Sequence, residues 1–209
     1  MIIIEDKGQK EGKHKLKHNY FANRGIELQR YPLPVGDYAI CNDKMLDVIM
    51  RKAVRGQEPK KMDFLGTYSR VVDTKKDIQE LIGNICGAQH NRFRDECILA
   101  QNNGIELFVL VENEPSVIIP KWGDKTPIHN PEVHNLQELF RWVNPRLFLD
   151  YKQIYGYSNG KKTKVACATK GKVIAKACIT MQEKYGVKFV FCNPKNAGQR
   201  VLELLRNGK

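Results

Sequence analysis

The stretch between residues 71 and 111 constrains the fold of this 209-residue chain more than any other part. A short strand at residues 71–75 leads directly into a segment with apolar residues at i, i+3, i+4 and i+7, which are Ile78, Leu81, Ile82 and Ile85. That spacing predicts a helix with one buried face. A second helix is expected at about residues 92–102, and the apolar run 105–111 predicts a strand covered by helices on both faces. This order indicates an α/β fold.

Strands and helices also alternate at both ends of the chain. Toward the N-terminus we expect a buried strand at residues 2–4, a basic helix ending near Gly25, strands at 26–31, 33–41 and 45–50, and an exposed loop at 51–61. Toward the C-terminus we expect a helix at 171–184, a strand at 187–192 and a helix at 197–205. Residues 113–164 are irregular and rich in proline, with a short helix at 136–143. We therefore expect a single domain over residues 1–209, with an insertion at about 113–164.

The charge of the chain favours a polyanionic partner. Lysine and arginine number 35 against 23 aspartates and glutamates, which gives a formal net charge of +12. Basic side chains that contact phosphates release condensed counterions, so this surplus favours nucleic acid, although a generally basic protein would show the same balance. No apolar run approaches the roughly 20 residues that span a membrane. Because the apolar start is followed at once by Glu5 and Asp6, it reads as a strand rather than a signal peptide, and we expect a cytoplasmic protein without a membrane partner.

The residues that carry chemistry lie at the end of the strand at 71–75. Side chains two apart on a strand project from the same face, so Asp73 and Lys75 are expected to point together and Thr74 away from them. An acid beside a lysine suits metal-assisted hydrolysis of a phosphodiester: the carboxylate holds a divalent ion, while the lysine orients or activates water and offsets charge on the phosphate. Mg²⁺ requires further oxygen ligands, so a second carboxylate is needed.

Asp37 is the candidate for that second carboxylate. It follows Gly36, which would let the backbone bend and present the acid at the edge of the sheet. An acid followed, some tens of residues later, by D-x-K on a strand that leads into a helix is the pattern of the PD-(D/E)xK nuclease group. On its own the pattern is weak, since Asp73 and Lys75 could equally form a solvated ion pair at a strand end.

Further motifs resemble the XPF-type structure-specific endonucleases. Residues 33–38, LPVGDY, resemble the family's L-x-x-G-D-Y motif, and Asp73-Thr74-Lys75 stands where the family carries E-R-K. Residues 80–85, ELIGNI, resemble its D-L-I-G-S-L helix, and Arg92-Phe93 with Glu96 resembles its R-F-x-x-Q. Residues 107–112 resemble its L-L-I-E strand, and residues 3–6 its opening strand and aspartate. The motifs occur in order over residues 2–112, which makes chance a poor explanation.

The chain departs from the family pattern at three places. Asp73 replaces the motif glutamate, Thr74 replaces the arginine, and Gly8 and Gln9 stand where the opening D-x-R-E carries arginine and glutamate. D-T-K also occurs in compact bacterial and phage members of the family. The C-terminal residues 181–192 resemble the closing pattern of the same members. No paired hairpins with G-x-G turns follow, so we expect no tandem helix-hairpin-helix domain.

The resemblance implies a three-layer α/β/α restriction-endonuclease-like fold with a central mixed sheet. It implies an endodeoxyribonuclease of a bacterial or phage-infected cell that acts on branched or flapped DNA, in contexts such as DNA repair or recombination. The catalytic residues would be Asp37, Asp73 and Lys75, with Mg²⁺ or Mn²⁺ held by Asp37 and Asp73 and with Asp6 adding to the acidic cluster. The partner would be branched or duplex DNA, bound either by a monomer or by a homodimer.

Two basic groups are candidates for DNA contacts. Arg92 and Arg94 could bind phosphates, or Arg92 could support the active site, although surface arginines near a helix N-terminus would look the same. Lys161, Lys162 and Lys164 form a basic run that follows two tyrosines, which suits backbone contact or base stacking, but a solvated loop is the common alternative. Two other functions stay open: an inactive DNA-binding domain that kept the fold, and an RNA-directed nuclease.

Overall fold

The computed structural model describes residues 1–121, 123–148, 155–158, 161–164 and 168–207. Its centre is a six-stranded sheet with the strand order β10-β5-β4-β3-β1-β2. The strands are β1 (Ile2–Asp6), β2 (Glu27–Tyr31), β3 (Tyr38–Ile40), β4 (Arg70–Lys75), β5 (Glu106–Glu112) and β10 (Lys188–Cys192). Strand β3 runs antiparallel to both of its neighbours, and the remaining pairs are parallel. The sheet is therefore mixed, as the sequence predicts.

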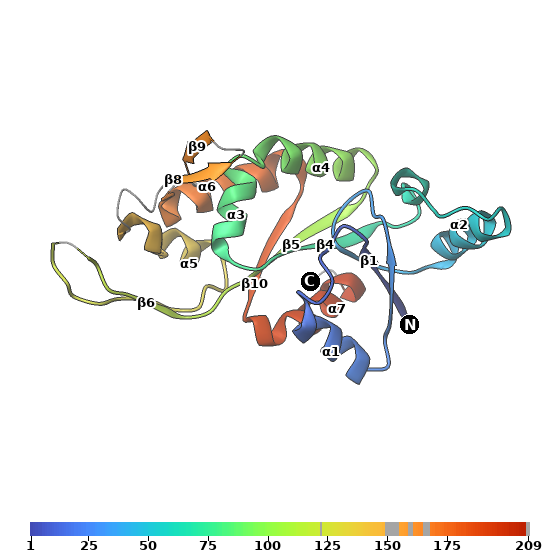
Figure 1. Cartoon of the computed structure of the whole chain (residues 1–209), viewed down its shortest axis with the longest axis horizontal. Coiled ribbons are helices and arrows are strands. Elements are labelled where there is room, and N and C mark those ends of the chain that lie inside the picture. Colours follow the sequence, from blue (N-terminus) through green and yellow to red (C-terminus); the bar gives the residue numbers. More distant parts are fainter. Residues whose placement is uncertain (122, 149–154, 159–160, 165–167, 208–209) are drawn as a thin grey trace.

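Helices cover both faces of this sheet (Figure 1). On one face lie α3 (Ile78–Ile85), α4 (His90–Asn102) and α6 (Gly171–Tyr185), and on the other lie α1 (Lys15–Asn23) and α7 (Ala197–Asn207). Each face has its own apolar core. The first core contains the buried residues of α3, α4 and α6, and the second contains those of α1 and α7. The predicted three-layer α/β/α architecture is confirmed.

The alternation of side chains along the strands builds the two cores. Val71 of β4 belongs to the core beneath α3 and α4, whereas the next residue, Val72, belongs to the core beneath α7. In β5, Val109 and Leu110 divide between the two cores in the same way. Because both faces of β5 are covered, its residues 107–111 are all apolar and buried. The predicted stripe of α3 is likewise buried at all four positions, and Asp77 caps this helix by accepting a hydrogen bond from the Glu80 N–H.

The strand predicted at residues 45–50 is wrong, because these residues belong to helix α2 (Asp43–Val54). Asn42 caps α2 by accepting a hydrogen bond from the Met45 N–H, and the buried side chains, Met45 and Val48, are three residues apart, as on one face of a helix. The predicted loop at 51–61 is correspondingly shorter, since α2 continues to Val54. The strand predicted at 33–41 shrinks to β3, because Gly36 has a φ of 69° and bends the chain before it.

The segment predicted as an irregular insertion contains short elements. They are β6 (Ser116–Ile118), β7 (Ile128–Asn130), α5 (Leu136–Arg141), the 3-10 helix η2 (Pro145–Phe148), β8 (Tyr155–Ser158) and β9 (Lys161–Lys164). Helix α5 packs against the first core, the one beneath α3, α4 and α6, since Leu139 is fully buried there. Short 3-10 helices also occur at η1 (Lys61–Phe64) and η4 (Pro194–Asn196). Within the described part of the chain, no helix has both the length and the apolar character needed to cross a membrane.

Candidate active site

Asp37 lies where β1, β3 and β4 meet at one end of the sheet. Its N–H donates to the Val72 carbonyl over 2.9 Å, and its own carbonyl accepts from the Asp6 N–H over 2.7 Å. The bend that brings it there requires Gly36, because a Cβ at that residue would lie 2.4 Å from Cγ2 of Val71. The Gly36 N–H donates to Glu96 Oε1 over 2.7 Å, which ties this turn to α4. The acid is thus held at the strand end by backbone bonds on both sides.

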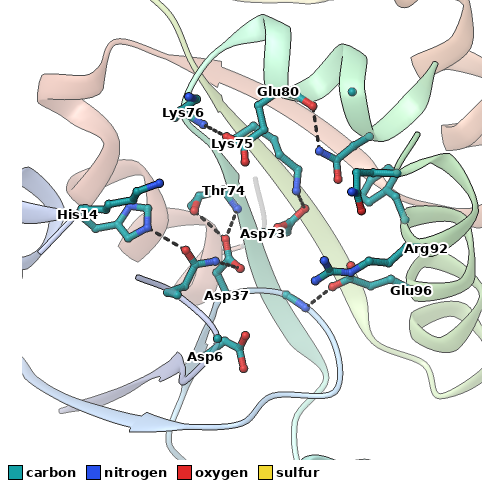
Figure 2. Close-up of a pocket in the computed structure, with 18 of the residues that line it drawn as sticks. Asp6, His14, Asp37, Asp73, Thr74, Lys75, Lys76, Glu80, Arg92 and Glu96 are labelled. Carbon is teal, nitrogen blue, oxygen red and sulfur yellow. Dashed lines mark hydrogen bonds and ion pairs between the residues drawn. The ribbon is translucent and has the colours of Figure 1, made fainter. Parts of the chain in front are cut away.

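Asp73 and Lys75 form a buried ion pair beside Asp37 (Figure 2). Lys75 Nζ lies 2.6 Å from Asp73 Oδ2, and the two residues are 7% and 4% exposed. The ammonium also lies over the Phe93 ring, 5.4 Å from its centroid. The two side chains share a face of β4, as the sequence predicts, and they face α4.

The electrostatics of this pair concentrate charge at the strand end. Burial raises the pKa of Asp73 well above its usual value; the neighbouring carboxylates of Asp37 and Glu96 add to this, and Lys75 opposes it. Burial alone would lower the pKa of Lys75, but the carboxylates of Asp73 and Asp37 outweigh it and raise the pKa above the usual lysine value. Lys75 therefore stays protonated, and three carboxyl groups, those of Asp73, Asp37 and Glu96, lie around this one ammonium.

The carboxylate of Asp37 accepts hydrogen bonds at both oxygens. The N–H and the Oγ1 hydroxyl of Thr74 both donate to Oδ2 over 2.7 Å, and Gln9 Nε2 donates to Oδ1. Thr74 extends away from the Asp73–Lys75 pair, as predicted, and toward Asp37 (Figure 2). The threonine that replaces the motif arginine thus orients a candidate catalytic acid.

Asp6 lies in the same cleft but is partly engaged elsewhere. Its Oδ1 accepts from the Leu33 N–H over 2.9 Å. Burial raises the pKa of Asp6, and the nearby charge of Asp37 acts in the same direction. Asp6 is therefore a further carboxyl group of the cleft, beside Asp37.

The donor set fits a divalent cation in its chemistry. Among the described residues, no group of three or more His, Cys, Asp or Glu side chains is arranged to hold a metal ion. However, Asp73 Oδ2 is buried and, apart from its ion pair with Lys75, accepts no hydrogen bond of good geometry. Oxygen donors alone, with excess negative charge, are what Mg²⁺ and Mn²⁺ prefer. Asp37 and Asp73 are therefore the residues that fit such an ion.

The acids lie in a cleft of about 970 Å³ with basic side chains around it. Four of these basic side chains come from separate segments: Lys13 precedes α1, Lys61 begins η1, Lys76 links β4 to α3, and Arg92 belongs to α4. All four are exposed, and within the described part of the chain none of them forms an ion pair. Unpaired cations around an acidic centre suit a phosphate backbone that passes over it.

The residues predicted to bind DNA differ in where they lie relative to the cleft. Arg92 lines the cleft, whereas Arg94 does not and instead forms an ion pair with Asp95 at 2.9 Å. The backbone of Lys161, Lys162 and Lys164 forms β9, which pairs with β8, but their side chains lie outside the described part of the structure. Their contact with DNA stays a prediction.

Glu96 and Gln9 are two of the cleft residues that were not among the predicted site residues. Glu96 appeared only as part of a helix motif, yet it lies one helical turn after Arg92 and therefore on the same face of α4. Gln9 appeared only as a departure from the opening motif. That departure was the one sequence feature that could have indicated a role for Gln9 in the site. Each contacts a residue far away in the sequence: Glu96 accepts a hydrogen bond from the Gly36 N–H, and Gln9 donates one to the Asp37 carboxylate.

The fold and the acidic cleft define an α/β nuclease domain, and the sequence comparisons identify its family. The sequence profile of the ERCC4 domain matches residues 6–205, so the chain belongs to the ERCC4 domain family, a family of structure-specific nucleases. The predicted resemblance to the XPF-type nuclease domain is confirmed. No curated protein sequence matches the chain. Among solved structures, XPF from Aeropyrum pernix is similar with 12% identity and a TM-score of 0.48; the match covers 98% of this chain and 64% of that one.

Proposed function

We propose that the protein is a divalent-metal-dependent endonuclease that hydrolyses phosphodiester bonds in branched or flapped DNA. The observation that carries the proposal is the convergence of Asp37, Asp73 and Lys75 at one end of the sheet, in a cleft that unpaired cations also line. Membership in a structure-specific nuclease family supports the branched substrate.

Asp37 and Asp73 would hold Mg²⁺ or Mn²⁺, with Asp6 as a further carboxyl group beside them. Such an ion supplies Lewis-acid activation of the scissile phosphate. The protein prepares for it by holding the Asp37 carboxylate in one orientation through Thr74 and Gln9. Positioning before substrate binding lowers the reorganisation that the reaction requires.

Lys75 would stabilise charge rather than remove a proton. Its raised pKa keeps it protonated at neutral pH, so it cannot serve as a general base there. A buried ammonium beside the reacting phosphate offsets the negative charge that grows on the phosphate oxygens in the transition state.

The DNA backbone would follow the cations around the cleft. Its phosphates would contact the exposed basic side chains that line the cleft, which are Lys13, Lys61, Lys76 and Arg92. Arg94 and the lysines of β9 would extend this contact beyond the cleft. A binding mode of this kind fixes the position of the strand without reading its sequence.

A cleavage assay tests the proposal directly. Duplex, flap, fork and four-way junction DNA, each end-labelled, are incubated with the purified chain in Mg²⁺, in Mn²⁺ or in EDTA. We expect cleavage of at least one branched substrate with either metal and none in EDTA. Binding of every substrate without cleavage in any metal would support the inactive DNA-binding domain instead. Cleavage confined to matched RNA substrates would indicate an RNA-directed nuclease.

A further inference from the structure

We infer that Gln9 is a positioning residue for Asp37, and that His14 sets the orientation of the Gln9 amide. Neither residue carries a chemical step. The inference rests on the proposed role of Asp37 as a metal ligand, and it assigns a function to the place where the opening motif of this chain departs from that of the family.

A tight turn brings Gln9 to the site. The Gln9 N–H donates to the Asp6 carbonyl over 3.0 Å, which closes a four-residue turn at the end of β1. Gly8 lies against the Asp6 carboxylate in this turn: a Cβ there would lie 2.7 Å from Asp6 Oδ2, so the carboxylate would have to shift. The chain therefore folds back over Asp6, and the Gln9 side chain reaches Asp37.

Arg30 holds this turn against the sheet. Its guanidinium donates to the Gln9 carbonyl and, over 3.3 Å, to the Lys7 carbonyl. The same group pairs with Glu5, which is 2% exposed, at 3.2 Å. The backbone that carries Gln9 is therefore attached to an ion pair whose acid is buried, so the Gln9 side chain starts from a defined position.

The hydrogen bonds fix which end of the amide faces the acid. An ionised carboxylate only accepts hydrogen bonds, so the NH₂ end of Gln9 must face Asp37 Oδ1. The carbonyl end then faces His14, whose Nε2 lies 2.8 Å from Gln9 Oε1. That contact requires a proton on His14 Nε2, so the histidine donates to the amide oxygen (Figure 2).

The consequence is an Asp37 carboxylate with both oxygens held. Thr74 donates two hydrogen bonds to Oδ2 and Gln9 donates one to Oδ1, so Oδ1 keeps one acceptor direction for another partner. A glutamate at residue 9 could not donate this hydrogen bond and would place a second negative charge against Asp37. The neutral amide therefore orients the acid without repelling it, as partners of metal-binding carboxylates commonly do.

Titration calorimetry with Mn²⁺ on the DNA-free protein tests the role of Gln9. We expect Gln9→Met, which keeps the volume but not the donor, to weaken Mn²⁺ binding by about 10-fold or more, the usual cost of losing a partner of a metal ligand. Cleavage should lose more at limiting Mn²⁺ than at saturating Mn²⁺, because the defect is in holding the ion. Gln57→Met, at an exposed loop residue, is the matched control and should leave both unchanged.

A double-mutant cycle tests the role of His14. His14→Phe should weaken Mn²⁺ binding several-fold in the wild-type background and have no further effect in the Gln9→Met background, because it acts only through the amide. Additive effects of the two substitutions on Mn²⁺ binding would overturn the coupling between His14 and Gln9. A drop in the thermal midpoint of Gln9→Met large enough to account for its weaker Mn²⁺ binding would overturn the positioning role of Gln9.

Asp37→Asn separates the failure of this inference from that of the proposed function. If Asp37→Asn loses Mn²⁺ binding while Gln9→Met binds like the wild type, the positioning role is wrong and the metal site stands. If Asp37→Asn itself binds Mn²⁺ normally, the proposed site fails, and the inference fails with it.

Discussion

Removal of the Lys75 charge should destabilise the protein strongly in the absence of metal. The substitution Lys75→Met keeps most of the aliphatic stem but removes the ammonium that pairs with Asp73 at 2.6 Å. It also removes the cation from its position over the Phe93 ring. Asp73 then stays buried with the carboxylates of Asp37 and Glu96 nearby and with no cation to offset its charge.

Burial decides the size of this effect. The side chains of Lys75 and Asp73 are 9% and 6% exposed. An exposed ion pair is worth about 0–1 kcal/mol, whereas removal of one partner from a buried pair costs about 3–5 kcal/mol. We therefore expect Lys75→Met to lower the free energy of unfolding by about 3–5 kcal/mol at neutral pH. Lys76→Met, next in the chain and exposed, should cost less than about 0.5 kcal/mol.

The loss should depend on pH in a defined direction. The folded-state pKa of Asp73 already lies above its unfolded value in the wild type, because burial and the neighbouring acids favour the neutral form, and loss of Lys75, which lowers it, raises it further. Folding is then penalised increasingly as pH rises from the unfolded pKa of about 3.9 toward the folded value. The deficit of Lys75→Met relative to the wild type should consequently be smallest at low pH, where Asp73 is protonated in both proteins, and should grow as the pH rises through the folded-state pKa of Asp73 in the wild type.

Urea unfolding in EDTA, followed by circular dichroism, measures these differences. Adding Asp73→Asn to Lys75→Met should recover most of the lost stability, since no buried charge remains without a partner. If the double variant is as unstable as Lys75→Met, or if Lys75→Met costs no more than Lys76→Met, the two groups are not coupled and the electrostatic account of this strand end is wrong.

Two further predictions concern the backbone at the site and the buried thiols. Gly36→Ala should lower the free energy of unfolding by about 2–5 kcal/mol, because it places a side chain on a left-handed backbone and also against Val71. The control Gly56→Ala, with a φ of 63° and open space around it, should lower it by only about 1–2 kcal/mol. Equal losses in urea unfolding would contradict the collision with Val71. Iodoacetamide at pH 8 should modify the exposed Cys86 well before the buried Cys97, because burial raises the pKa of the Cys97 thiol to about 12. Peptide mapping that finds Cys97 labelled first would refute this order.

Much of the fold follows from local patterns in the sequence. The stripe from Ile78 to Ile85 and the apolar run of β5 are long enough for their periods to be read without ambiguity. The short run from Met45 to Met50 is not, because nearly every position is apolar and a period of two cannot be told from one of 3.6. The capping residue Asn42 was the signal that favoured a helix.

The candidate site could be predicted only as far as strand geometry reaches. Alternation along β4 places Asp73 and Lys75 on one face, which the structure also shows. The hydrogen bonds that hold the Asp37 turn and carboxylate come from Gln9 and Glu96, which are 28 residues before Asp37 and 60 residues after Gly36. Such contacts depend on how the turn after β1 and helix α4 pack on the sheet, and no local period encodes that packing.

Single-turnover cleavage of a flap or junction substrate by Asp37→Asn and Asp73→Asn tests the central claim most directly. Each substitution removes a carboxylate charge at the strand end with almost no change in volume, and Asp47→Asn, on the exposed side of α2, is the matched control. We expect both site variants to lose cleavage by at least about 100-fold in Mg²⁺, to keep DNA affinity in Ca²⁺, and the control to cleave like the wild type. Cleavage at the wild-type rate by either site variant would show that the phosphodiester is hydrolysed elsewhere.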